Sequence, residues 1–461
     1  MLCGCLAQSA QRPNILLISI DDLNDWVGCL GGHPQALTPN IDRLARRGTL
    51  FTNAHCQSPV CNPSRASMLT GRYPHSTGIY FLSPPLTVAP ALKNVLTLPE
   101  YFAKHGYHTL AVGKIFHGND KRFFHEYGGN NGGFGPRPKK KISQPHGHPL
   151  WDWGVFPDSD DKMPDMIAAK WAINKLNQDH NQPFLLGVGF YRPHVPMFAT
   201  QEWFDRHPRE TIQLPLVKDD DRNDLSQYAI NLTNLEHVAP KHEWIKTAGE
   251  WDQAVQAYLA SVTFVDHCLG LVLDALDAGP HARNTIIVLF SDHGFHLGEK
   301  QRWAKRSLWE DGTRVPLIIS APGYTASQRC PRPAELLDIF PTLLDLAGLE
   351  PDENQEGQSL VPLMQNPIAT WNHPAITSFG PGNYSVRSTR YRLIQYADSS
   401  REFYDHQNDR HEWTNLSQNP ELKDLITKHA AHIPAKEHDL LSGNSTGHKA
   451  FDAANQRLAG R

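Results

Sequence analysis

The sequence predicts an α/β protein with a doubly wound sheet that carries helices on both faces, followed by a smaller C-terminal subdomain. Short, continuous apolar runs alternate with helix-like segments until about residue 360, and short strand-like pieces follow. Such apolar runs fit strands that are buried on both faces of a parallel sheet. Because 461 residues exceed one minimal core, we expect a main domain over 12–360 and a subdomain over 361–461.

The individual elements follow from local patterns. Apolar runs bounded by polar residues predict strands, and apolar residues at helical spacing predict helices. The expected strands cover 14–20, 49–54, 108–113, 183–190, 284–290, 315–320, 391–396 and 402–405, and the expected helices cover 40–48, 64–72, 97–106, 166–178, 250–276 and 336–346. Two polar stretches, 119–165 and 205–247, lack both patterns. Loops of this length inside a compact domain are usually functional or disordered.

Composition and net charge indicate which kinds of partner and cellular location to expect for the protein. A net charge of −4, with 20% charged residues, gives no reason to expect a nucleic-acid partner. No apolar run approaches the length of a membrane span, so we expect no transmembrane segment. The first ten residues, MLCGCLAQSA, fit the tail of an export signal or a disordered leader. On the first interpretation the protein is exported to a periplasmic, extracellular or lysosome-like compartment. The seven scattered cysteines suggest no metal-site spacing and assign no disulfide.

Two acidic pairs follow two of the predicted strands directly. Asp21 and Asp22 come after the first strand, and Asp292 with His293 follows the strand at 284–290. In open α/β sheets ligands bind beyond the carboxyl ends of the strands. Three carboxylates at one edge raise one another's pKa unless a cation compensates them, and oxygen ligands favour Ca²⁺ or Mg²⁺ over zinc. The alternative is that these aspartates only cap turns.

A cysteine precedes a short predicted helix in the run VCNPSRASMLTGRYP. Cys61 lies where a helix N-terminus offers free N–H groups and a partial positive charge. Arg65 presents a planar fork of donors that can grip an oxyanion or a group made from the cysteine. A small buried cysteine before an ordinary helix is the competing interpretation.

The Cys-x-Pro-Ser-Arg run followed by Leu-Thr-Gly-Arg resembles the signature of the type I sulfatases. The resemblance implies an alkaline-phosphatase-like fold with a mixed sheet and a small antiparallel sheet in the C-terminal subdomain, so that 12–360 is the sulfatase catalytic domain. It also implies that a formylglycine-generating enzyme converts Cys61 to formylglycine, whose hydrated form is the nucleophile. In this pattern one Ca²⁺ is held by Asp21, Asp22, Asp292, His293 and the modified Cys61.

Three further runs resemble iduronate-2-sulfatase and its bacterial relatives. These are GKIFH at 113–117, RPHVP at 192–196 and WAK at 303–305. The resemblance implies that Lys114 and Lys305 join Arg65 around the sulfate. It also implies that His194 or a lysine protonates the leaving oxygen, with His117 as a base. The expected substrate is a 2-O-sulfated uronic acid of a sulfated oligo- or polysaccharide, with Arg192 and Arg302 as candidates for binding its carboxylate.

Two other functions fit the same residues. Relatives of the sulfatases use this fold and the modified cysteine to hydrolyse phosphate or phosphonate monoesters, although a doubly charged phosphoryl group would need more cations. A non-catalytic binder of sulfated glycan would keep the pocket without ever receiving the aldehyde.

Overall fold

The computed structural model describes residues 12–118, 123–143, 150–233 and 238–459. The export prediction depends on the first ten residues and therefore lies outside the described part of the chain. Five cysteines, at positions 29, 56, 61, 268 and 330, are free thiols in the described ranges.

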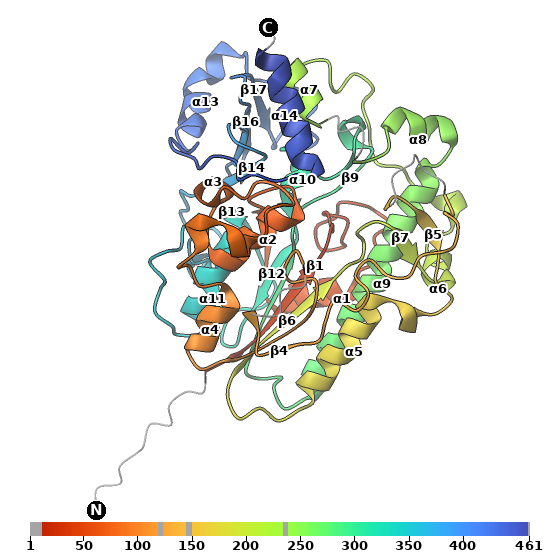
Figure 1. The fold of residues 1–461 in the computed structure, drawn as a ribbon, viewed down its shortest axis with the longest axis vertical. Coiled ribbons are helices and arrows are strands. Elements are labelled where there is room, and N and C mark those ends of the chain that lie inside the picture. The colour runs from red at the N-terminus through yellow and green to blue at the C-terminus, as the bar shows by residue number, and fades with distance from the viewer. Residues whose placement is uncertain (1–11, 119–122, 144–149, 234–237, 460–461) are drawn as a thin grey trace, which may run out of the picture.

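A mixed sheet forms the centre of the molecule (Figure 1). Its strand order is β11–β2–β12–β8–β1–β6–β3–β4, and β13 also pairs with β2. The run from β8 to β4 is parallel, whereas β12 is antiparallel to both of its neighbours. The strands are β1 (Asn14–Ile20), β2 (Thr49–His55), β3 (His108–Gly113), β4 (Glu126–Tyr127), β6 (Phe184–Phe190), β8 (Thr285–Ser291), β11 (Arg314–Val315), β12 (Leu317–Ser320) and β13 (Gln328–Glu335).

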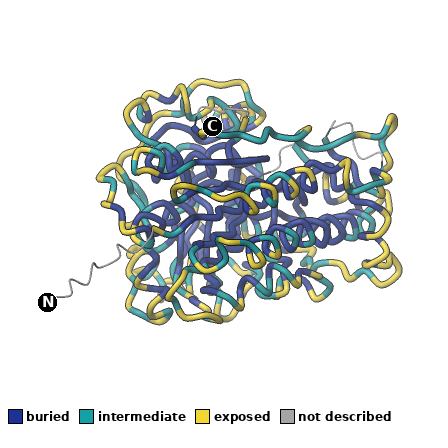
Figure 2. Tube along the Cα trace, turned by 90° about the horizontal axis from the view of Figure 1, so that it is seen from below, coloured by how far each residue is buried: buried dark blue, intermediate teal, exposed yellow. Residues whose placement is uncertain are grey.

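Helices cover both faces of this sheet. One face packs against α1 (Pro39–Arg47), α5 (Pro164–Leu176) and α9 (Trp251–Ala278), and the other against α2 (Cys61–Thr70), α4 (Leu98–Lys104) and α11 (Ile339–Leu346). Alternate residues of β1 enter the two cores, so Leu16 and Ile18 lie on one side and Ile15 and Leu17 on the other. This explains the continuous apolar run, and Figure 2 shows the buried trace through the interior. The predicted doubly wound fold is confirmed.

Helix α9 corrects one expectation. It is 28 residues long and apolar enough to span a membrane by length and composition, whereas the sequence was expected to hold no such segment. However, 78% of its most apolar window is buried inside the fold. Packing against α5 and α1, in a core that also holds side chains of β1, β6 and β8, therefore accounts for its apolar character.

The C-terminal part forms a smaller layer above the main sheet (Figure 1). It contains the antiparallel sheet β14–β15–β16–β17, as expected, together with two helices. The bounds are β14 (Ala375–Ser378), β15 (Tyr384–Arg387), β16 (Tyr391–Gln395), β17 (Arg401–Asp405), α13 (Lys423–Ala430) and α14 (Thr446–Ala459). Shorter elements complete the described chain: α3 (Pro74–Thr77), α6 (Gln201–Asp205), α7 (Gln227–Thr233), α8 (His242–Ala248), α10 (Glu310–Thr313), α12 (Val361–Gln365), β9 (His296–Leu297) and β10 (Trp303–Ala304).

Three local predictions need correction. Helix α2 begins at Cys61 rather than at residue 64, because Pro63 in the first turn removes an N–H that has no partner within the helix anyway. The strand expected at 315–320 is divided at Pro316, which has no N–H to donate to the sheet. The stretch 119–165, expected to be irregular, contains β4 and β5 (Trp153–Val155), and β5 pairs with β7 (Met197–Ala199) outside it; the stretch 205–247 contains α7 and α8.

Candidate functional site

The carboxyl ends of two neighbouring strands bring the predicted acidic residues together. Ile20 of β1 pairs in parallel register with Ser291 of β8, so the residues that follow leave the sheet side by side. One ligand atom each from Asp21, Asp22, Cys61 and His293 lies within 4.8 Å of the others. All four residues are buried. The sequence-based metal set is thus spatially compact, and four of its five members offer converging ligand atoms.

Asp292, the fifth member, lies beside this cluster with its oxygens already engaged. Its Oδ1 accepts a hydrogen bond from the Asp22 backbone N–H at 3.2 Å, and its Oδ2 accepts one from Arg65 Nε at 2.9 Å. The same Oδ2 lies 3.6 Å from His293 Nε2. Burial raises the pKa of the Asp292 carboxyl to about 7, and Arg65 only partly opposes this rise.

The guanidinium of Arg65 binds the carboxylates of Asp21 and Asp292 and does not project into open space. Its Nη2 lies 3.3 Å from Asp21 Oδ1, and its Nη1 donates to Ser19 Oγ at 3.0 Å and to the Lys114 carbonyl. Fully buried, the guanidinium fixes Asp21 and Asp292 in one arrangement, as its rigid fork allows.

Two lysines surround Cys61. Lys305 Nζ lies 3.1 Å from Cys61 Sγ and 2.6 Å from Asp22 Oδ1, and Lys114 Nζ binds Asp21 Oδ2. Burial alone would raise the pKa of the thiol, but Lys114, Lys305 and His293 outweigh it and hold the pKa well below its usual range. The position therefore stabilises negative charge on the side chain of residue 61.

A close approach between the neighbouring parallel strands β3 and β6 places Lys114. Gly113 has φ +74, and a Cβ there would lie 1.9 Å from the Gly189 carbonyl oxygen. Only glycine satisfies both the left-handed backbone and this close approach. The chain consequently turns at the end of β3 and directs Lys114 into the cluster.

Two histidines complete the predicted set. His194 Nδ1 lies 2.6 Å from the Val195 carbonyl oxygen, which assigns the Nδ1 proton and leaves Nε2 3.7 Å from Asp22 Oδ2. His117 favours the ionised form of Cys61, and its Nδ1 has no hydrogen-bond partner in the described part of the chain. Both rings therefore offer a nitrogen for proton transfer near residue 61.

The two arginines proposed for a substrate carboxylate make other contacts. Arg192 is fully buried and donates from Nε to the Phe198 carbonyl at 2.9 Å and from Nη2 to the Phe134 carbonyl at 3.1 Å. Arg302 donates from Nη2 to the Lys305 carbonyl. Burial, together with Arg306 and Arg222, lowers the pKa of Arg302 to about 9.

Sequence reasoning missed two side chains at this site. Phe134, from the stretch expected to be irregular, stacks on His194 at 4.4 Å and lies 5.4 Å from Lys114 Nζ. Arg306 is 4% exposed, has φ +75, and its charge interacts with Cys61 and Asp22. Its Nε and Nη1 have no hydrogen-bond partner among the described residues. The only sequence signal for Arg306 was its place directly after Lys305.

A buried group of acids, lysines and histidines around a helix-N-terminal thiol, at the carboxyl edge of a mixed α/β sheet, defines a hydrolase of anionic esters with an alkaline-phosphatase-like fold. A solved structure of a 2-O GAG sulfatase matches with a TM-score of 0.72, covering 98% of this chain and 94% of that one at 22% identity. That likeness confirms the predicted fold class.

Sequence comparison identifies the family. A sulfatase family model matches residues 13–349, and a model of the C-terminal part of N-sulphoglucosamine sulphohydrolase matches residues 298–439. The chain is 42% identical over 443 residues to a sulfatase of Formosa agariphila, covering 93% of this chain and 87% of the relative. The chain therefore belongs to the sulfatase family. The two matched regions overlap, so the domain boundary at residue 360 stays a prediction.

Two further relatives carry more specific names. The chain is 34% identical over 393 residues to iduronate 2-sulfatase of Mus musculus, covering 73% of this chain and 69% of the relative. It is 28% identical over 451 residues to a Delta 4,5-hexuronate-2-O-sulfatase of Bacteroides thetaiotaomicron, covering 93% and 90%. The predicted resemblance to iduronate-2-sulfatase and its bacterial relatives is confirmed.

Proposed function

We propose that this sulfatase removes sulfate from a 2-O-sulfated uronic acid of a polysaccharide, with residue 61, converted to formylglycine, as the nucleophile. The observation that carries the proposal is the convergence of Cys61, Lys114 and Lys305 on the buried carboxylates of Asp21 and Asp22. The names of the uronate 2-sulfatase relatives support the substrate class. An exported location would suit a polysaccharide substrate and is part of the same proposal.

The donor set fits a calcium ion. Carboxylates and one imidazole present oxygen-rich ligation, and Asp22 Oδ2 is a buried atom without a hydrogen-bond partner in the described ranges. Asp21, Asp22, His293 and residue 61 would hold the ion, and Asp292 would lie beside it with its oxygens bound to the Asp22 N–H and to Arg65. When bound, calcium would supply Lewis-acid polarisation of an oxygen at residue 61.

The modification suits the surroundings of Cys61. As formylglycine, the side chain would supply an aldehyde hydrate, with one hydroxyl to attack sulfur and a second whose deprotonation releases sulfate. The cations that stabilise the ionised thiol, Lys114 and Lys305, would stabilise an oxyanion at the same place. A thiol offers no second hydroxyl, so an unmodified Cys61 cannot complete this cycle.

The chain's own side chains would then handle charge and protons. Lys114 and Lys305 bind the sulfate oxygens and compensate the charge that develops during transfer. The doubly protonated ring of His194 gives the leaving oxygen a proton from Nε2 and keeps the Nδ1 proton, which is tied to the Val195 carbonyl. His117 accepts a proton from residue 61 through a ring nitrogen.

A uronate substrate adds a carboxylate beside the sulfate, and Arg306 is the side chain best placed to bind it. Arg306 leaves both Nε and Nη1 without a hydrogen-bond partner among the described residues, whereas Arg302 leaves only Nε and Arg192 neither. Unlike those two arginines, Arg306 also interacts with Cys61 and Asp22. A guanidinium can bind a carboxylate bidentately, whereas a lysine offers only a point charge.

The test compares sulfate release from a 2-O-sulfated uronate disaccharide with release from a 6-O-sulfated hexosamine of equal size. We expect faster hydrolysis of the uronate, and Arg306→Lys should reduce that preference by raising KM for the uronate alone. Faster hydrolysis of the hexosamine would overturn the substrate class. Faster hydrolysis of a matched phosphate or phosphonate monoester would instead favour the alternative reaction.

A further inference from the structure

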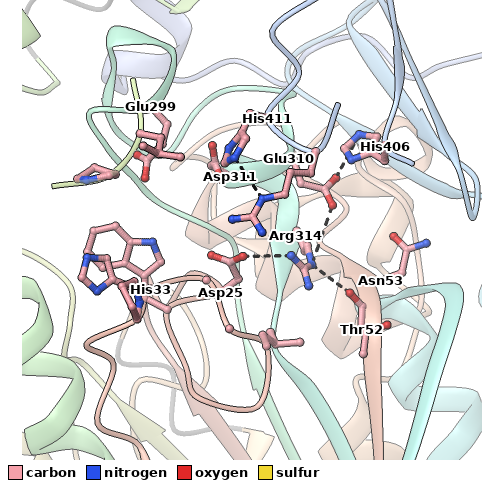
Figure 3. A pocket seen from close by; sticks show the side chains of 18 of the residues that line it. Asp25, His33, Thr52, Asn53, Glu299, Glu310, Asp311, Arg314, His406 and His411 are labelled. Carbon is pink, nitrogen blue, oxygen red and sulfur yellow. Dashed lines mark hydrogen bonds and ion pairs between the residues drawn. The ribbon is translucent and has the colours of Figure 1, made fainter. Parts of the chain in front are cut away.

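A second group of three potential metal ligands lies beside a large cavity, and two of them, Glu299 and Asp311, line its wall. The cavity has a volume of about 550 Å³ and is lined by the loop after β1, the segment 213–216 and parts of the C-terminal subdomain. Figure 3 shows Glu299 and Asp311 among the side chains that face it. Ligand atoms of His296, Glu299 and Asp311 lie within 4.8 Å of one another. None of these three residues belongs to the catalytic cluster.

The imidazole of His296 is oriented as a metal ligand would be. The residue is 0% exposed, and its Nε2 lies 2.6 Å from Ser307 Oγ. Its Nδ1 has no hydrogen-bond partner in the described chain and lies 3.9 Å from Asp311 Oδ2. In the tautomer whose Nε2–H donates to Ser307 Oγ, the lone pair of Nδ1 is available on the side of Asp311. Metal-binding histidines typically use their second nitrogen for such an anchoring hydrogen bond.

The charges of His296, Glu299 and Asp311 are consistent with a metal-binding role for the three side chains. Burial, reinforced by Arg302 and Lys300, outweighs the opposing effect of the Glu299 backbone and holds the pKa of His296 well below its usual range, which favours the neutral ring. Burial raises the pKa of Glu299 to about 7, and Asp25 adds to this rise. Glu299 and Asp311 form no ion pair with a lysine or arginine within the described ranges, since Arg314 pairs with Asp25 instead (Figure 3).

A neighbouring trio provides an internal contrast. Glu310, His406 and Glu412 also place ligand atoms within 4.8 Å of one another. However, Arg392 Nε lies 2.7 Å from Glu412 Oε1, and both Arg392 and Arg387 bind Glu310. Arginines therefore already compensate this trio, whereas the trio of His296, Glu299 and Asp311 retains two uncompensated carboxylates and a free nitrogen lone pair.

We propose that His296 Nδ1 and the carboxylates of Glu299 and Asp311 form a second, structural site for a divalent transition-metal ion such as Zn²⁺. The nitrogen ligand favours this class over Ca²⁺, which takes oxygen ligands. The Asp311 side chain is 35% exposed and gives the ion a path from the cavity. The three ligands bracket residues 300–306, so a bound ion would fix the loop that carries Lys305.

The experiment uses Co²⁺ as a spectroscopic probe in excess Ca²⁺, which occupies oxygen-rich sites. We expect the full-length protein to bind one Co²⁺ with visible absorption bands, and Zn²⁺ to remove them. His296→Ala should lose the bands, whereas His406→Ala, from the arginine-compensated trio, should keep them.

Zn²⁺ should also raise the Tm of the wild type and of His406→Ala, and leave that of His296→Ala unchanged. If circular dichroism shows that His296→Ala is unfolded, Glu299→Gln replaces it. Absence of the bands in the wild type, their persistence in the His296 or Glu299 variant, or their loss in His406→Ala would overturn the proposal.

Discussion

The catalytic cluster and the Glu310–Glu412 cluster bury carboxylates in opposite ways. Arg387, His406 and Arg392 outweigh burial and hold the pKa of Glu310 well below its usual range. Arg392 and His406 likewise lower the pKa of Glu412. Around Asp21 and Asp22 the compensation is incomplete, because Asp22 Oδ2 has no hydrogen-bond partner within the described residues and has only His194 Nε2 nearby, at 3.7 Å. A rigid arginine guanidinium can bind both oxygens of a carboxylate and so link two structural elements. A lysine ammonium is a point charge, so it leaves carboxylate oxygens available for a ligand. Incomplete compensation therefore distinguishes the reactive cluster from the structural one.

The largest expected effect comes from removing the nucleophile. Cys61→Ala should lower turnover by more than about 10³-fold, as loss of a covalent catalyst does. Binding of the sulfated disaccharide should survive, because Lys114 and Lys305 remain. Kinetics and calorimetric binding on the same preparations would measure both effects.

Cys56→Ala is the matched control for this variant. Cys56 is equally buried, but burial holds the pKa of its thiol well above the usual range, so it carries no charge for a nearby lysine to stabilise. We expect near-normal turnover in Cys56→Ala. Near-normal turnover in Cys61→Ala would place the nucleophile elsewhere.

The next prediction contrasts a lysine of the catalytic cluster with an arginine of the structural one. Lys305→Ala should lower kcat by about 10²–10³-fold, the usual loss for one donor at a developing charge. Arg392→Met should instead lower the free energy of unfolding by about 3–5 kcal/mol, because it leaves Glu310 and Glu412 buried without their partner. Urea unfolding together with kinetics separates the two. A large loss of kcat in folded Arg392→Met would contradict the purely structural role assigned to Arg392.

Withdrawal of calcium should affect only the incompletely compensated cluster. Treatment with a calcium-selective chelator should abolish turnover and lower the Tm, and Ca²⁺ should restore both. At one hundred times its Kd, a bound ligand stabilises a protein by about 2.7 kcal/mol. Asp22→Asn, which removes one ligand charge, should show a much smaller calcium-dependent Tm shift. An unchanged response in Asp22→Asn would exclude this cluster as the calcium site.

A third pair, Glu335 and Asp338, is buried and forms no ion pair with a lysine or arginine in the described chain, and we expect it to give the smallest change in stability. Burial, together with Asp338, raises the pKa of Glu335 to about 8, so the folded protein keeps a proton that the unfolded chain releases near pH 4.5. Stability from this group is therefore full below about pH 4.5 and is lost as the pH rises toward 8. The slope is at most about 1.4 kcal/mol per pH unit for one proton.

Glu335→Gln tests this assignment, because an amide can still accept the Ile376 N–H and meet the Tyr73 hydroxyl. The free energy of unfolding of the variant, measured from pH 5 to 8, should fall less steeply than that of the wild type. Parallel curves would show that Glu335 does not hold the proton.

Much of the site could be predicted because its residues follow strand ends. The apolar runs before Asp21 and Asp292 place both pairs at one edge of the sheet. Because β1 and β8 are paired in parallel register, with Ile20 beside Ser291, the two pairs lie side by side at that edge. Side chains from irregular segments could not be placed this way. Phe134 reaches the site because Arg192 binds its carbonyl, a contact between residues 58 positions apart. Likewise, whether an arginine offers free donors, as Arg306 does and Arg192 does not, depends on packing that local pattern does not encode.

The central claim is that residue 61, in its lysine-rich surroundings, becomes the formylglycine nucleophile. The most direct measurement is mass spectrometry of the peptide that contains residue 61, from protein produced with a formylglycine-generating enzyme. Sulfate release is measured on the same preparation and on one produced without that enzyme. We predict the aldehyde mass at residue 61 and sulfate release in proportion to its occupancy. An unmodified thiol in protein that releases sulfate at full rate would contradict the account.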